Sequence, residues 1–201
     1  MLFEIGKLYL AEGDSILIGD PCYIPDSIDL ILKYKKPWIK GNLLRVYVDM
    51  TNDSIFGGDP RNSSFILSSK DNELREINKY KLNFIGHVGV DSGEVSFLGS
   101  SLVETWVKFS DDDSAGYFNP NSDLDACSQV TLEYQLSAGA HEKHIKFKIS
   151  GSQARKPMAT VFSSATFDGD GTYSVYELNT KGGDKSTTVG LMVDFAGKYR
   201  A

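Results

Sequence analysis

The chain has few cysteines and no long apolar segment, and each shortage excludes a class of protein. Only two cysteines, Cys22 and Cys127, occur among its 201 residues, and they lie far apart. A disulfide-stabilised scaffold is not indicated, because a chain of this size can build a core without crosslinks. No apolar run reaches the length of a membrane span, and the start of the chain lacks the pattern of a signal peptide. We expect a cytoplasmic protein that does not contact membranes.

Positive charge is also scarce. Lysine and arginine together number 21 against 27 aspartates and glutamates, which gives a formal net charge of -6. A sequence-independent grip on nucleic acid needs clustered basic side chains that neutralise phosphates. We therefore expect no nucleic-acid partner.

The residues that are abundant favour strands and turns. There are 19 glycines, 10 tyrosines and 11 phenylalanines, and aromatic side chains suit a half-buried sheet whereas glycine weakens helix interiors. Alternating segments such as 43–49 and 143–149 have the period of a strand. We predict one β-rich domain spanning residues 1–201, an antiparallel sandwich or strongly bent sheet. One or two short helices are expected, over 26–35 and, on a weaker pattern, over 72–80.

Glycine-containing turns follow several of the predicted strands. Three of them are Ala11–Asp14, Asp91–Gly93 and Asp168–Gly171. Glycine provides the positive φ angles that tight turns need, and apolar segments flank each turn. The pattern predicts that each turn closes a hairpin between two paired strands.

Three aspartates stand within two residues of a glycine at the ends of apolar segments, namely Asp20, Asp91 and Asp170. If they converge, their carboxylates could hold Mg²⁺ or Ca²⁺ and support hydrolysis of a phosphodiester or phosphoryl substrate. The simpler interpretation is that each aspartate accepts hydrogen bonds from backbone amides of a turn. The run from Asp168 is not an EF-hand loop, because its twelfth position is Asn179 where that loop has glutamate.

Other polar residues near these aspartates extend the candidate site. Tyr23, Tyr173 and Tyr176 could line a pocket, but strand alternation sends Tyr173 and Tyr176 to opposite faces. We predict a ligand-binding edge of the sheet and neither metal ligands nor a resident cofactor. Its candidate residues are Asp20, Cys22, Tyr23, Asp91, Ser92, Asp170 and Tyr173.

Two other pairs of residues could have a catalytic or metal-binding role, and each also has an ordinary structural explanation. Cys22 could act as a nucleophile with His87 as its base, but a buried, inert cysteine beside proline is the commoner case. His141 and His144 could bind zinc together on a helix. The alternating sequence after them predicts a strand instead, where residues three apart diverge. We therefore predict no catalytic residue.

Dispersed motifs resemble a family of bacterial and phage proteins of unknown function. The motifs are IGDPCY at 18–23, VDSG at 90–93, DAC at 125–127, a serine pair at 163–164, GDGTYSVY at 169–176 and LMVDF at 191–195. The chain departs from the family pattern ahead of the last turn, where Ala165, Thr166 and Asp168 stand. The resemblance implies a bacterial or phage origin and no established activity.

The absence of a strong nucleophile–base pair, metal motif or phosphate loop favours a non-catalytic function. We predict a binding protein that recognises a protein or a small-molecule ligand through Asp/Gly loops at a sheet edge. The alternative hypothesis is a metal-dependent hydrolase that uses Asp20, Asp91 and Asp170.

Overall fold

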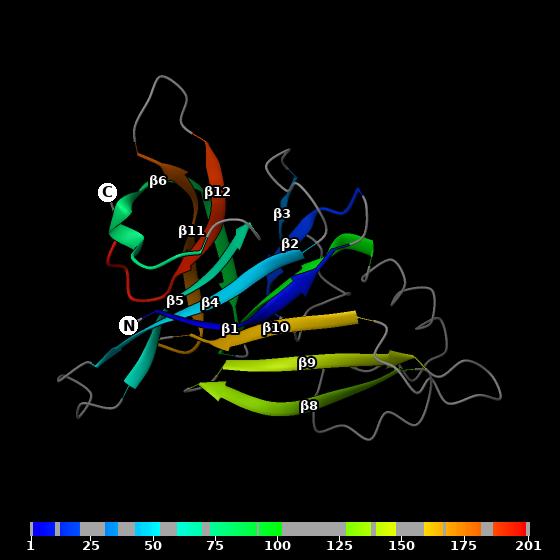
Figure 1. Cartoon of the computed structure of the whole chain (residues 1–201). Helices are drawn as coiled ribbons and strands as arrows, with labels where there is room; N and C mark the ends of the chain where they lie inside the picture. Colours follow the sequence, from blue (N-terminus) through cyan, green and yellow to red (C-terminus); the bar gives the residue numbers. More distant parts are fainter. Residues whose placement is uncertain are drawn as a thin grey trace.

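The structure, a computed structural model, describes most of the chain in separate ranges (Figure 1). These are residues 2–10, 13–20, 31–35, 43–52, 60–69, 73–91, 93–101, 128–137, 140–147, 159–166, 168–181 and 187–199. Within them the strands form two antiparallel sheets of six strands each. The mainly β fold predicted from composition and periodicity is confirmed.

Sheet A has the strand order β1-β4-β5-β12-β11-β6. Its strands are β1 (Leu2–Tyr9), β4 (Leu43–Asn52), β5 (Pro60–Ser69), β6 (Tyr80–Val90), β11 (Gly171–Thr180) and β12 (Thr188–Asp194). Sheet B has the order β3-β2-β7-β10-β9-β8. Its strands are β2 (Ile16–Gly19), β3 (Leu32–Tyr34), β7 (Glu94–Gly99), β8 (Ser128–Ser137), β9 (Ala140–Phe147) and β10 (Ala159–Ala165).

The main core lies between the two sheets. Along β4, Val46 and Val48 point inward and are fully buried, which is the alternation expected of a strand with one covered face. Phe65 of β5 and Phe97 of β7 stack across the interface with ring centroids 4.4 Å apart. The inner faces of sheets A and B therefore share one hydrophobic core, the arrangement of a sandwich.

The three predicted hairpins are wrong, because in each case the flanking strands belong to different sheets. The chain passes from β1 to β2, from β6 to β7 and from β10 to β11, and each passage leads from one sheet to the other. Gly13, Gly93 and Gly169 lie in these passages with φ angles of 83°, 74° and 84°. The glycines do provide turns, as predicted, but the turns are corners at which the chain changes sheet.

The helix predictions are also corrected. Leu32, assigned to a helix over 26–35, begins β3 and pairs with Ile18 of β2. Pairing with a neighbouring strand has overridden the helical spacing of the apolar residues, and residues 26–30 lie outside the described ranges. Of the described part of the segment 72–80, which begins at residue 73, only Ile77–Lys79 forms a helical turn, the 3₁₀ helix η4, and Tyr80 already begins β6.

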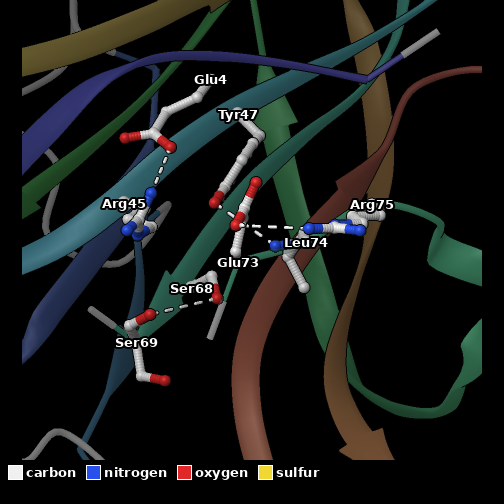
Figure 2. Close-up of polar contacts among 8 residues, drawn as sticks. All are labelled: Glu4, Arg45, Tyr47, Ser68, Ser69, Glu73, Leu74 and Arg75. Atoms are coloured by element: carbon white, nitrogen blue, oxygen red, sulfur yellow. Dashed lines mark hydrogen bonds and ion pairs between the residues drawn. The ribbon is translucent and has the colours of Figure 1, made fainter. Parts of the chain in front are cut away.

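The outer face of sheet A carries a second, smaller hydrophobic cluster. Leu74 and Ile77 cover it from the segment that contains η4, and Tyr199 packs against it from the C-terminal segment. Figure 2 shows one contact between this segment and sheet A, in which the Leu74 amide donates a hydrogen bond to the Tyr47 hydroxyl at 3.4 Å. Burial raises the pKa of the Tyr47 phenol. Both faces of sheet A are thus partly buried.

Among the residues that the structure describes, none belongs to a helix long and apolar enough to cross a membrane.

Candidate functional site

Two of the sheet-to-sheet passages meet at one place. We call Asp20, Asp91, Gly93, Thr166 and the segment 168–171 the Asp/Gly corner. β6 lies beside β11 in sheet A, and β7 lies beside β10 in sheet B. The β6–β7 and β10–β11 passages therefore connect the same two pairs of neighbouring strands, in opposite directions.

Asp20 is the buried member of the corner. It follows β2 and is 3% exposed, and its Oδ2 accepts a hydrogen bond of 2.8 Å from the backbone amide of Asp91. The carboxylate thereby links the end of a strand in sheet B to the end of β6 in sheet A. Such a bond to a charged acceptor is stronger than one between neutral groups. Asp20 stabilises a turn distant in sequence, which the turn-capping interpretation did not specify.

Thr166 joins the two passages. Its backbone amide donates to the Gly93 carbonyl at 2.9 Å, and its hydroxyl lies within hydrogen-bonding distance of the Gly93 and Gly169 carbonyls. A Cβ atom placed on Gly93 would lie 3.8 Å from the Gly169 Cα, so the two glycines approach closely. These contacts fix the backbone of the corner.

Three carboxylates of the corner are exposed, those of Asp91, Asp168 and Asp170. Gly171 pairs with Val90 in the β11–β6 ladder, so antiparallel register places Asp170 across from Asp91. The positions of Asp170 and Asp91 are therefore adjacent, and Asp20 contacts Asp91 through the Asp91 amide.

Tyr173 lies below the corner, toward the core. It is 6% exposed, packs edge-on against Phe195, and donates its hydroxyl to the Gly169 carbonyl at 2.7 Å. Burial is the largest cause of its raised pKa, and the charges of Asp168 and Asp170 add to it. The Tyr173 hydroxyl thus supports the turn from beneath.

Tyr176 lies on the opposite face, as strand alternation predicts. Its ring packs edge-on against that of Phe84 with the ring centroids 5.9 Å apart, and its hydroxyl donates a hydrogen bond to the Tyr199 carbonyl at 3.1 Å. His87 is exposed on the same outer face beside Phe84. Tyr173 and Tyr176 consequently do not line one pocket.

Three residues of the predicted ligand-binding edge are not among those that the structure describes. Cys22, Tyr23 and Ser92 lie outside the described ranges, so the proposed Cys22–His87 pair has no described geometry. His141 and His144 both lie in β9, a strand, as the sequence predicted. Among the described residues, no group of three or more histidine, cysteine, aspartate or glutamate side chains is arranged to hold a metal ion.

Two polar features of the structure, Thr166 and Glu177, are not among the residues predicted from the sequence. Thr166 stands directly before the Asp/Gly turn, and its hydroxyl was the available signal, because threonine often bonds nearby carbonyl and amide groups. The second is Glu177, which is 3% exposed on β11. Its carboxylate accepts hydrogen bonds from the Tyr34 hydroxyl at 2.8 Å and from the Asn83 amide at 3.2 Å. No sequence pattern indicated that a glutamate in an apolar strand would be bonded by β3 and β6.

Comparisons with models of protein families, with characterised proteins and with solved structures find no match. The resemblance to bacterial and phage proteins of unknown function stays a prediction.

Proposed function

We propose that the protein is a non-catalytic binding protein and that the Asp/Gly corner recognises a ligand carrying positive charge. The ligand is a basic segment of a protein or a small cationic molecule. One observation carries the proposal: exposed carboxylates of Asp91, Asp168 and Asp170 stand on a backbone that Asp20 and Thr166 hold in place. A fixed backbone reduces the conformational freedom that these residues lose when they bind a cationic group.

A metal-dependent hydrolase would use the same region differently. It would require Asp20, Asp91 and Asp170 to share a cation through their carboxylates. No specific observation favours this alternative, because Asp91 contacts the Asp20 carboxylate through its backbone amide and not through its own carboxylate. The binding hypothesis needs only the exposed acids.

The test is a calorimetric titration with a short oligolysine peptide and with spermidine at low ionic strength. The double variant Asp168→Asn/Asp170→Asn removes two corner charges. We expect binding to weaken by roughly fivefold to thirtyfold, since exposed ion pairs contribute about 0.2–1 kcal/mol each and a partly fixed site lies at the upper end. Raising the salt concentration should reduce the wild-type affinity.

Glu73→Gln/Glu76→Gln is the matched control, because it removes two exposed acids from the segment before and at the start of η4. This control should bind as the wild type does. Equal weakening in both double variants would mean that the probes respond only to net charge, and would contradict the proposal. Absence of binding by the wild type would also contradict it.

A further inference from the structure

A second polar group lies on the outer face of sheet A, away from the Asp/Gly corner. Register places Ser64 of β5 directly between Asp49 of β4 and Asp194 of β12. Phe65 points into the main core, so alternation sends the Ser64 side chain to the outer face. The outer-face residues Tyr47, Ile66 and Met192 occupy the next row of the same three strands.

Ser64 is the unusual member of the row that it forms with Asp49 and Asp194. It is fully buried, and its hydroxyl oxygen has no hydrogen-bond partner among the described residues. A buried hydroxyl is almost always bonded, and an orphaned one calls for an explanation such as a water molecule or an ion. The Ser64 hydroxyl therefore indicates a missing polar partner between the two neighbouring strands.

The two flanking aspartates provide the charge that such a partner would meet. Asp194 is 2% exposed, and its two carboxylate oxygens accept hydrogen bonds from the backbone amides of Lys198 and Tyr199 at 3.3 and 3.0 Å. Asp49 is half-buried and accepts a bond from the Ser63 hydroxyl at 3.2 Å. A carboxylate oxygen that accepts one hydrogen bond still has a lone pair for a cation.

The C-terminal segment is bonded to this row. Phe195 and Ala196 donate backbone hydrogen bonds to the Ser63 carbonyl, and Tyr199 reaches back toward the aspartates. Burial raises the pKa of the Tyr199 phenol, and the charges of Asp49 and Asp194 both raise it further. The fully buried Ser64 therefore lies between two aspartates whose negative charges act on the same neighbouring residue, Tyr199.

We propose that Asp49, Ser64 and Asp194 form a cation site on the outer face of sheet A, for a hard divalent ion of the calcium type. Two carboxylates neutralise the double charge, and the Ser64 hydroxyl supplies a third oxygen. Ca²⁺ accepts carboxylate, hydroxyl and water oxygens in flexible geometry, whereas Mg²⁺ demands a near-ideal octahedron. The bound ion holds the C-terminal segment against the sheet through Asp194. This site is independent of the binding function proposed for the corner.

Thermal unfolding of the full chain with and without Ca²⁺ tests the site. At a Ca²⁺ concentration about 100 times its dissociation constant, the wild-type Tm should rise by roughly 5–10 °C. Ser64→Ala should lose most of this rise. It should not lower the Tm measured without Ca²⁺, because the hydroxyl that it removes has no partner in the described structure. Asp49→Asn is a second variant that should also lose the rise.

Luminescence of bound Tb³⁺, a substitute for Ca²⁺ that nearby tyrosines sensitise, locates the ion. Tyr199→Phe should remove most of the signal, whereas Tyr173→Phe, which changes a tyrosine beside Asp168 and Asp170, should retain it. The double variant Asp168→Asn/Asp170→Asn should keep the full Ca²⁺ response.

Three outcomes would overturn the site. A wild-type Tm that does not change in millimolar Ca²⁺ would indicate that a water molecule satisfies Ser64. A Ca²⁺ response kept in Ser64→Ala and Asp49→Asn but lost in the Asp168/Asp170 double variant would assign the ion to the corner. Loss of the Tb³⁺ signal in Tyr173→Phe alone would do the same.

Discussion

At the scale of the residue, the meaning of an aspartate depends on a partner that the local sequence does not reveal. Asp20 stands beside Gly19, as a turn-capping aspartate does, yet it bonds the amide of Asp91, 71 positions away. The presence of a polar role was therefore predictable, because aspartate beside glycine marks strand ends. The identity of the bonded amide was not, since it depends on how two sheets meet.

We predict that Asp20→Ala lowers the free energy of unfolding by about 1–3 kcal/mol, because it removes the buried carboxylate that accepts the hydrogen bond of the Asp91 amide. Asp20→Asn keeps an acceptor oxygen and should cost less than Asp20→Ala. Urea unfolding followed by circular dichroism measures both. Asp168→Asn, an exposed acid of the same corner, is the control and should change stability by no more than about 0.5 kcal/mol. Equal losses in Asp20→Ala and in this control would refute the structural role of Asp20.

At the scale of the element, turns were easier to predict than the partners of the strands that they join. Gly93 and Gly169 have the positive φ angles that the Asp/Gly pattern indicated. The sequence contains no signal for whether the next strand folds back beside its predecessor or enters the opposite sheet. A polar turn between two apolar strands is expected in both cases. This difference changes the candidate site directly. The turns at Asp91–Gly93 and Asp168–Gly171, predicted as the tips of two separate hairpins, together form the Asp/Gly corner.

Gly169→Ala tests whether the corner depends on left-handed backbone. A Cβ atom at Gly169 meets nothing within 4 Å, so any loss is conformational rather than steric. We expect about 1–2 kcal/mol of destabilisation, the cost of placing an L-residue at positive φ. Gly89→Ala in β6 is the matched control, because it too has open space for a Cβ atom and needs no positive φ. Unfolding in urea should show Gly89→Ala as stable as the wild type or slightly more stable. A loss of the same size in both would contradict the role of φ.

At the scale of the whole molecule, composition and the alternation of apolar residues predicted a mainly β fold, either an antiparallel sandwich or a strongly bent sheet. Val46 and Val48 lie on the inner face that their spacing indicated. The strand order was beyond prediction, because β5 pairs with β12 and β2 pairs with β7 across long stretches of sequence. Prediction of a single domain spanning the chain follows from composition and length, and it is open to a direct test.

The shared core makes that test possible. Phe65 in sheet A and Phe97 in sheet B are both fully buried and stack on each other, so neither inner face stays covered if the other sheet unfolds. We predict that Phe97→Ala costs about 3–5 kcal/mol and that both sheets then unfold together in one transition at lower urea concentration. Far-ultraviolet circular dichroism and tyrosine fluorescence should report coincident midpoints. Phe84→Ala, which truncates a ring that is 51% exposed on the outer face, should cost less than about 1 kcal/mol. Two separate transitions, with only one of them displaced in Phe97→Ala, would mean that the sheets are independent units and that residues 1–201 do not form a single domain.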